Sequence, residues 1–275
     1  MTPMTSSTGD FPPSRQPLDI TRLRAALVDH GPYTRVDYTP TTGSTNGDLL
    51  DADREGAPDW TVATTDYQDR GRGRLGRPWT APEGSQAIFS VLFRPRPSLL
   101  EHLGTVPLAC GLALIDTLRS FGVDGVGLKW PNDVLINGRK LCGILVEATS
   151  LDTTPAVVIG IGINLNLTTG ELPVPHATSL ALEGYDIDRT DLLIRVLGHI
   201  HARISDWERG ETVWLDDYRA VCSSLGQDVR VILPGDRELL GVAVGIAEGG
   251  QLMVRDEEGT IHTLSAGEVT HLRLQ

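Results

Sequence analysis

The stretch DVLINGRKLCGILVE, residues 133–147, carries the strongest local structural signal in the chain. Its Asn137-Gly138 dipeptide stands between two apolar runs, and this dipeptide is preferred in type I′ turns that join antiparallel strands. A two-residue turn pairs Ile136 with Arg139, Leu135 with Lys140, Val134 with Leu141 and Asp133 with Cys142. Because side chains alternate along a strand, we expect one face to carry Asp133, Leu135, Lys140, Cys142 and Ile144.

Lys140 would lie on that face among apolar side chains, diagonal to the carboxylate of Asp133. A buried lysine requires an anionic partner, and the strand that follows is apolar on both faces from Leu141 to Val146. This pattern favours a functional lysine over the alternative, a surface ion pair on an edge hairpin. Lys129 and Lys140 are the only lysines of the chain, and we treat both as candidates for anion binding.

Outward from this hairpin, the apolar pattern predicts further strands and helices. The strands are expected over 34–38, 60–66, 87–93 and 156–165. Helical spacing predicts helices over 18–30, 99–121, 192–207 and 213–221. A further helix runs to Gly56, and Ser44 or Thr45 can cap its start.

Beyond Gly226 the pattern changes to five short β-like runs between turn residues, over 228–233, 238–246, 251–255, 260–264 and 268–273. Short strands at even spacing suggest a small β-barrel. We therefore expect three parts: a disordered tail rich in Pro, Ser and Thr over 1–17, a main domain over 18–223 and a small C-terminal domain over 224–275.

Composition limits the kind of protein. The chain has 275 residues, 40% of them hydrophobic, and a net charge of −12, which is typical of a globular protein and excludes a disordered or fibrous one. No run approaches the roughly 18 apolar residues of a membrane span, and the acidic balance argues against broad nucleic-acid or membrane binding. Three sparse cysteines and the lack of a signal sequence favour a reducing, cytoplasmic location.

An arginine- and glycine-rich loop, RGRGRLGR at 70–77, stands out in this acidic chain. Guanidinium groups match the oxygens of phosphates and carboxylates, and glycines allow the backbone close to a ligand. The loop is not a Walker A motif, because no Gly-Lys-Ser/Thr follows, and it is not a dinucleotide-binding turn. Two alternatives stay open beside a ligand-binding loop: a solvated basic surface loop, and a segment that binds single-stranded nucleic acid, although no aromatic residue is interleaved within 70–78.

Four blocks, in order along the chain, closely resemble the biotin–protein ligase family. They are GRGRLGRPW at 71–79, KWPND at 129–133, KLCGILVE at 140–147 and GIGINLN at 160–166, with Ser44-Thr45-Asn46 upstream. The resemblance implies an α+β fold, in which a mixed β-sheet is flanked by helices as in class II aminoacyl-tRNA synthetases, and a small C-terminal SH3-like β-barrel. The short tail is similar to that of the family's monofunctional members, which have no N-terminal DNA-binding domain.

The resemblance also implies the activity of a biotin–[acetyl-CoA-carboxylase] ligase. Biotin would attack the α-phosphorus of ATP, assisted by Mg²⁺, to give biotinoyl-5′-AMP and pyrophosphate. A lysine on a biotin carboxyl carrier domain of an acyl-CoA carboxylase would then accept the biotinoyl group and release AMP. Both reactants of the first step are anionic, so they need fixed cations. We expect no DNA and no membrane as partner, and a monomer or homodimer.

By similarity, two residues act in catalysis: Lys140 stabilises the biotin carboxylate and the adenylate bridge, and Arg74 orders over biotin and phosphate. The implied biotin-binding set is Ser44, Thr45, Asn46, Gln68, Arg72, Gly73, Arg74 and Lys140. The set implied for ATP and the adenylate is Arg72, Arg74, Trp79, Asn132 and Asn164, and the candidate metal ligand is Asp133. Structural roles compete for four positions: helix capping by Ser44 and Thr45, and the shaping of a strand end by Lys129 and Trp130. No chemistry is assigned to His176, His199 and His201.

Two other functions stay open as alternatives. A lipoate–protein ligase has a similar fold but lacks the GRGRLGRPW block, and the acid that drives ATP–pyrophosphate exchange distinguishes the two enzymes. A non-catalytic module that binds RNA or another anion through the arginine loop would release no pyrophosphate, and its binding would depend steeply on salt. The net charge of −12 disfavours this module.

Overall fold

The computed structural model describes residues 15–149, 155–210, 213–233, 237–265 and 267–271. Of the tail predicted over 1–17, residues 1–14 therefore lie outside the described residues. Arg15 is the first described residue, and its Nη2 forms an ion pair with Glu171 Oε2 at 2.5 Å. The last three residues of the predicted tail, 15–17, are therefore described by the structure, and the first of them contacts the main domain through its side chain.

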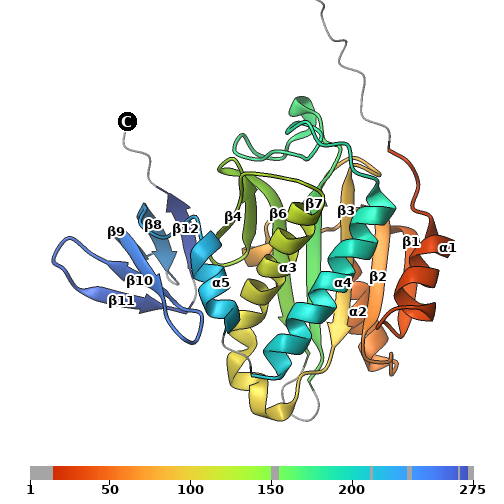
Figure 1. Ribbon diagram of the computed structural model, residues 1–275, viewed down its shortest axis with the longest axis horizontal. Helices are drawn as coiled ribbons and strands as arrows, with labels where there is room; N and C mark the ends of the chain where they lie inside the picture. The colour runs from red at the N-terminus through yellow and green to blue at the C-terminus, as the bar shows by residue number, and fades with distance from the viewer. Residues whose placement is uncertain (1–14, 150–154, 211–212, 234–236, 266, 272–275) are drawn as a thin grey trace, which may run out of the picture.

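A seven-stranded sheet in the order β1-β2-β3-β7-β6-β5-β4 forms the centre of the main domain (Figure 1). Among the described strands β1 and β2 pair in parallel, and the other neighbouring pairs are antiparallel. The mixed sheet predicted from the sequence is confirmed. Its strands are β1 (Arg35–Thr42), β2 (Thr61–Gln68), β3 (Gln86–Phe93), β4 (Val126–Lys129), β5 (Asp133–Ile136), β6 (Arg139–Ala148) and β7 (Val157–Asn164).

Helices cover both faces of this sheet (Figure 1). α3 and α4 lie side by side over one face, and α2 packs on the other against β2, β3 and β7. All residues of β3 and β7 are buried, as expected for central strands covered on both faces. The helices are α1 (Ile20–Arg24), which continues as a π-helical turn over Ala25–Asp29, α2 (Thr45–Arg54), α3 (Val106–Ser120), α4 (Arg189–Glu208) and α5 (Val213–Val221).

The predicted helix over 99–121 begins later than expected, because a 3₁₀ segment, Pro97–Thr105, precedes α3. By length and composition the joined run Pro97–Ser120 could cross a membrane, with a hydropathy of 1.5, yet 56% of its apolar window is buried inside the protein. Leu112 and Ile115 of α3 belong to the main apolar core. The apolar character of this run therefore reflects its place against the sheet and beside α4.

The hairpin of β5 and β6 forms where the sequence predicts it, with a different register. Asn137 and Gly138 have φ of 50° and 74°, as a type I′ turn requires. Lys140 pairs with Leu135 as predicted, but a β-bulge at Leu141 then shifts the partners. The predicted pairs of Val134 with Leu141 and Asp133 with Cys142 are therefore wrong: Val134 pairs with Cys142, and Asp133 pairs with Gly143.

The bulge also changes which side chains share a face. Cys142 packs into the main apolar core and does not line the cavity, so its predicted place beside Lys140 is wrong. Ile144 belongs to the same core and also lines the cavity. The extra residue brings Gly143 to the Lys140 face, where a Cβ on Gly143 would lie 3.7 Å from Lys140 Cε. Asp133, Leu135 and Lys140 line one cavity, as expected.

The C-terminal residues form a five-stranded antiparallel sheet in the order β11-β10-β9-β8-β12. All five predicted strands are confirmed, but a closed barrel is not formed by the described residues, because β11 and β12 lie at opposite edges of an open sheet. These two strands have four residues each, which leaves little length for the staggered pairing that closes a barrel. The strands are β8 (Asp228–Leu233), β9 (Arg237–Ile246), β10 (Leu252–Arg255), β11 (Ile261–Leu264) and β12 (Glu268–His271).

Candidate active site

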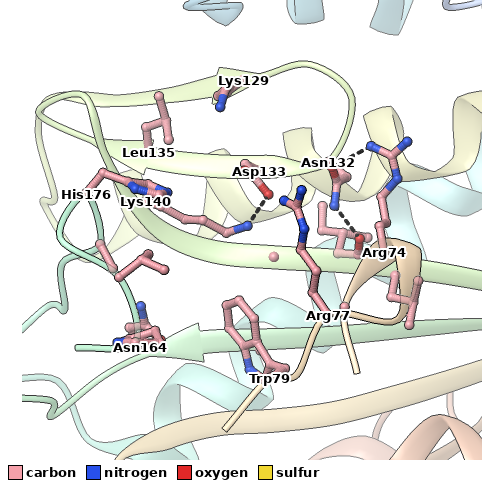
Figure 2. Close-up of a pocket in the computed structure, with 18 of the residues that line it drawn as sticks. Arg74, Arg77, Trp79, Lys129, Asn132, Asp133, Leu135, Lys140, Asn164 and His176 are labelled. Carbon is pink, nitrogen blue, oxygen red and sulfur yellow. Dashed lines mark hydrogen bonds and ion pairs between the residues drawn. The ribbon is translucent and has the colours of Figure 1, made fainter. Parts of the chain in front are cut away.

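A cavity of about 1120 Å³ lies between the start of α2, strands β6 and β7, and the arginine loop (Figure 2). Val269 and His271 of β12 also line it. The structure thus brings into one cavity segments that are distant in sequence, and it includes every residue predicted for the site: Ser44, Thr45, Asn46, Gln68, Arg72, Gly73, Arg74, Trp79, Asn132, Asp133, Lys140 and Asn164. Their contacts with ligands stay predictions.

One end of the cavity is a cluster of buried polar side chains. The Thr45 backbone N–H donates to Gln68 Oε1 at 2.8 Å, and Thr45 Oγ1 lies 2.7 Å from Ser90 Oγ. Ser90 Oγ donates to Asn46 Oδ1 at 2.6 Å, and Asn46 Nδ2 donates to Glu147 Oε2 at 2.7 Å. The sequence analysis missed Ser90 and Glu147. A signal for Ser90 was present, because it is the one hydroxyl in the apolar run 87–93, and a buried hydroxyl needs a partner.

Ser44 and Thr45 differ in their relation to α2. Ser44 occupies the N-cap position, but its hydroxyl makes no capping hydrogen bond, and the side chain lines the cavity. Thr45 is the first helical residue, and its hydroxyl joins the buried polar cluster. The capping role proposed as a competing explanation is therefore not formed by either hydroxyl.

Two glycines of β7 keep the cavity floor clear. A Cβ on Gly160 would lie 2.1 Å from Asn46 Oδ1, and a Cβ on Gly162 would lie 2.3 Å from Trp79 Nε1. These distances are shorter than any side chain allows, so the Trp79 indole lies directly on the strand. Trp79 Nε1 is buried and has no hydrogen-bond partner among the described residues. A ligand that supplied an acceptor there would satisfy this donor.

Lys140 projects into the cavity from β6, as Figure 2 shows. Its Nζ lies 2.6 Å from Asp133 Oδ1 and 5.5 Å from the centroid of the Trp79 ring. The main chain of Lys140 is held on both sides, because its N–H donates to the His176 carbonyl at 2.8 Å and its carbonyl accepts from Thr178 N–H at 2.9 Å. The main chain that carries the ammonium group is thus fixed by the fold, and Asp133 holds the group itself.

Positive charge dominates the cavity lining. Among the described residues that line it, Asp133 is the single acidic side chain, against six basic ones: Arg72, Arg74, Arg77, Lys129, Arg139 and Lys140. Figure 2 shows Arg77 and Lys140 extending toward Asp133 from two sides. A cavity with this balance of charge suits reactants that are both anionic.

The arginine loop folds back on itself at the rim. Gly73 N–H donates to the Arg77 carbonyl at 2.7 Å, and Arg72 and Pro78 form an isolated β-bridge. Arg74 connects this loop to two other parts of the molecule, since its Nη1 donates to Asn132 Oδ1 at 3.1 Å and its Nη2 to the Gly267 carbonyl at 3.3 Å.

Asn132 and Asn164 both have protein partners. Asn132 Nδ2 donates to the Ile144 carbonyl at 2.9 Å. Asn164 Nδ2 donates to the Thr178 carbonyl at 2.9 Å, and its Oδ1 accepts from Gln86 Nε2 at 2.7 Å. The two amides therefore shape the cavity wall, and their predicted contacts with the nucleotide stay predictions.

Trp130 has a structural role that differs from the strand-end role considered as the competing explanation. Its side chain is 2% exposed, and Nε1 donates to the Gly250 carbonyl at 2.9 Å, which joins the main domain to the C-terminal sheet. Lys129 and Trp130 both line the cavity.

The three histidines lie in different places. His199 and His201 contact Thr117 and Trp60 and belong to the packing. His176 lines the cavity, and partial burial together with the ammonium groups of Lys129 and Lys140 lowers its pKa below the ordinary value. The sequence analysis had assigned His176 no chemistry.

Comparison with known proteins gives matches over both sheets. The model of the biotin/lipoate A/B protein ligase family matches residues 38–164, and that of the biotin protein ligase C-terminal domain matches residues 224–272. The curated biotin–[acetyl-CoA-carboxylase] ligase of Mycobacterium tuberculosis is 40% identical over 94% of this chain and 97% of the relative. The bifunctional ligase/repressor BirA of Escherichia coli is 32% identical over 86% of this chain and 73% of the relative.

Solved structures agree with these sequence matches. The biotin protein ligase of Aquifex aeolicus in complex with biotin and ATP is similar with a TM-score of 0.74 at 29% identity, over 88% of this chain and 100% of that one. The biotin protein ligase of Leishmania major in complex with biotinyl-5-AMP is similar with a TM-score of 0.59 at 27% identity, over 85% of this chain and 99% of that one.

Proposed function

The chain belongs to the biotin protein ligase family, and we propose that its one large described cavity performs both steps of the reaction around Lys140. The enzyme is a biotin–[acetyl-CoA-carboxylase] ligase that activates biotin with ATP and transfers it to a carrier protein. In the first step a biotin carboxylate oxygen bonds to the α-phosphorus, and pyrophosphate leaves. In the second step a carrier lysine amine bonds to the acyl carbon, AMP leaves, and the amine loses a proton.

The position of Lys140 supports this assignment most strongly. Its ammonium lies 2.6 Å from the single carboxylate of the cavity lining, so it is held ready between the two anionic reactants. We place the biotin ring at the polar end beside Thr45, Asn46 and Gln68, and the biotin carboxylate next to Lys140. Fixed cations at such a position stabilise the charge that develops on the bridging oxygens, and they need no rearrangement during the reaction.

The nucleotide would occupy the other end of the cavity. Trp79 offers an aromatic face and the unsatisfied indole N–H, and Arg74 and Arg72 offer guanidinium groups for phosphate oxygens. Arg74 now bonds to Asn132 and to the Gly267 carbonyl. We propose that phosphate oxygens replace these neutral acceptors when ATP binds, because a charged acceptor forms the stronger hydrogen bond.

Mg²⁺ fits this cavity as part of the nucleotide substrate. The described residues contain no cluster of three or more acidic, histidine or cysteine side chains that could hold a metal by themselves. Mg²⁺ is commonly bound by one or two carboxylates together with substrate phosphates and water. Asp133 can supply the one carboxylate, and the ion would supply charge neutralisation of the phosphates.

The decisive experiment mixes the protein with biotin, Mg-ATP and a purified carrier domain and measures covalently attached biotin by intact mass. Attachment is expected with the natural carrier and not with a carrier whose acceptor lysine is replaced by arginine. ATP–pyrophosphate exchange, measured with biotin and then with lipoate, tests the acid. Exchange driven by lipoate but not by biotin would reverse the assignment, and release of no pyrophosphate would favour an anion-binding module.

Three further expectations belong to the same proposal. We propose that the acceptor is the carrier domain of an acyl-CoA carboxylase, that neither DNA nor a membrane is a partner, and that the enzyme acts in the cytoplasm as a monomer or homodimer. The three buried free cysteines are consistent with a reducing compartment. Light scattering of the purified protein measures the oligomeric state.

A further inference from the structure

The polar end of the cavity contains an unbroken chain of hydrogen bonds that continues behind it. Thr45, Asn46 and Gln68 line the cavity, whereas Ser90 and Glu147 do not. Thr45 is 3%, Asn46 4%, Gln68 7% and Ser90 0% exposed. Because these buried groups have little water to bond with, each donor hydrogen must find an acceptor within the cluster. The direction of each hydrogen bond therefore depends on the direction of the neighbouring ones.

Glu147 determines the direction of this chain. An ionised carboxylate has no hydrogen and can only accept, so the Asn46 amide must turn its nitrogen toward Glu147 Oε2, at 2.7 Å. Asn46 Oδ1 then faces Ser90, and the single hydrogen of Ser90 is donated to it at 2.6 Å. Ser90 has no other hydrogen, so in its 2.7 Å contact with Thr45 the Thr45 hydroxyl is the donor. The Thr45 hydroxyl also lies 3.2 Å from Gln68 Oε1, but its one hydrogen goes to the shorter contact with Ser90.

The same reasoning orients Gln68. Its Oε1 accepts from the Thr45 backbone N–H at 2.8 Å, which leaves Nε2 as the other end of the amide. Among the described residues Nε2 has no hydrogen-bond partner, since both polar contacts of this side chain, with the backbone and the hydroxyl of Thr45, involve Oε1. The cavity is therefore presented with an amide donor from Gln68 and, because the Thr45 hydrogen points inward to Ser90, with an acceptor lone pair from Thr45.

We propose that Ser90 and Glu147 are positioning residues that set this donor–acceptor pattern and so select the cyclic urea of biotin. A cyclic urea offers N–H donors to the Thr45 oxygen and a carbonyl acceptor to Gln68 Nε2. If the hydrogen bonds ran in the opposite direction, Ser90 would donate to Thr45, and the Thr45 hydroxyl would point its hydrogen into the cavity. Two donors, this hydroxyl and a ring N–H of the urea, would then face each other with no acceptor between them. A mismatched polar pair in a buried site is costly, so the direction of the chain is a specificity determinant. This inference rests on the proposed function.

The test uses Ser90→Ala, which interrupts the chain, and Glu147→Gln, which keeps its shape but adds a donor that allows the Asn46 amide to turn. We expect KM for biotin to rise roughly 10- to 100-fold in both variants, while KM for ATP stays within about twofold. Ser85→Ala is the matched control. Ser85 is also a fully buried serine next to β3, but its hydroxyl donates only to the Pro82 carbonyl and it does not line the cavity.

A second measurement distinguishes an effect of hydrogen-bond direction from an effect of altered packing around Ser90. A biotin analogue in which ring oxygen replaces one ureido N–H lacks the donor that Thr45 accepts. The wild-type enzyme should prefer biotin over this analogue, and the preference should shrink in Ser90→Ala and Glu147→Gln but not in Ser85→Ala. If Ser90→Ala does not fold, Glu147→Gln alone decides, because it removes no atoms from the core.

The failure of this inference can be told from a failure of the proposed function. A wild-type protein without biotin-dependent ATP–pyrophosphate exchange would contradict the function itself. A wild-type protein that exchanges normally, with both variants keeping the wild-type KM for biotin and the full preference over the analogue, would overturn the role of Ser90 and Glu147. Equal rises of KM for biotin and ATP would also overturn it, because they indicate general damage.

Discussion

At the scale of single residues, Lys140 is the side chain on which activity should depend most. Lys140→Ala removes the ammonium and leaves the Asp133 carboxylate unpaired in the cavity. We expect kcat/KM for biotin-dependent ATP–pyrophosphate exchange to fall by about 10²- to 10³-fold, the usual effect of removing one preorganised electrostatic group. Circular dichroism should show an unchanged fold. Lys140→Arg keeps the charge and should retain more activity; unchanged exchange in the alanine variant would remove Lys140 from the mechanism.

His176 reports on the electrostatics of the same cavity. Its pKa lies below the ordinary value because of burial first and then the ammonium groups of Lys129 and Lys140, against the opposite effect of Asp133. Removing a cation makes protonation of the imidazole less costly, so Lys129→Ala should raise the pKa of His176. An NMR titration of the imidazole Cε1–H measures the shift. Lys129→Arg keeps the charge, and an identical rise in that variant would mean that the shift has another cause.

At the scale of elements, the glycines of β7 should control the place of Trp79. A Cβ on Gly162 would lie 2.3 Å from Trp79 Nε1, so Gly162→Ala must displace the indole. We expect kcat/KM for ATP to fall by about 10- to 100-fold, since small displacements of positioning groups have effects of this size. Gly245→Ala in β9 is the control, because its Cβ would meet only Met253 Sδ at 3.5 Å. Equal kinetics in the two variants would contradict the close packing of Trp79.

The arginine loop should respond to ligands as a unit. The Arg70 side chain is 83% exposed and Leu75 is 79% exposed, and a segment with so little buried apolar surface opens readily. We expect biotin together with ATP to suppress tryptic cleavage after Arg70, Arg72 and Arg74, while cleavage after Arg209, at the end of α4, continues as before. Equal cleavage of the loop with and without ligands would count against ordering of the loop on binding.

At the scale of the whole molecule, Trp130 couples the two sheets. Its indole N–H donates to the Gly250 carbonyl at 2.9 Å, and its backbone N–H donates to Ser224 Oγ at 3.2 Å. Trp130→Phe leaves the buried Gly250 carbonyl without its donor, which should lower the free energy of unfolding by about 1–3 kcal/mol. Urea denaturation followed by circular dichroism measures this loss. Stability equal to that of the wild type would show that the contact between the sheets does not depend on this hydrogen bond.

The sequence predicted most of the elements, and the residues that it assigned to the site line one cavity. Its errors concern contacts that the local sequence does not encode. Asn137-Gly138 identified the turn, since only a few residue types adopt positive φ in both positions. The bulge at Leu141 could not be predicted from the sequence. Whether a residue is left unpaired between two strands depends on the neighbouring strands and not on the local sequence. The prediction of a closed C-terminal barrel was also wrong. The spacing of strands along a sequence does not show whether the two edge strands of a sheet pair with each other.

The amino-acid sequence by itself determined which residues gather around one cavity, since motifs with a fixed order and spacing identified them. It also determined most strands and helices, because these follow from local periodicity. Only the tertiary structure decided that Cys142 faces the core, that Asn46 connects Ser90 with Glu147, and that Trp79 lies on Gly162. These facts depend on contacts between segments far apart in the chain, and such contacts arise from packing in three dimensions rather than from any local pattern.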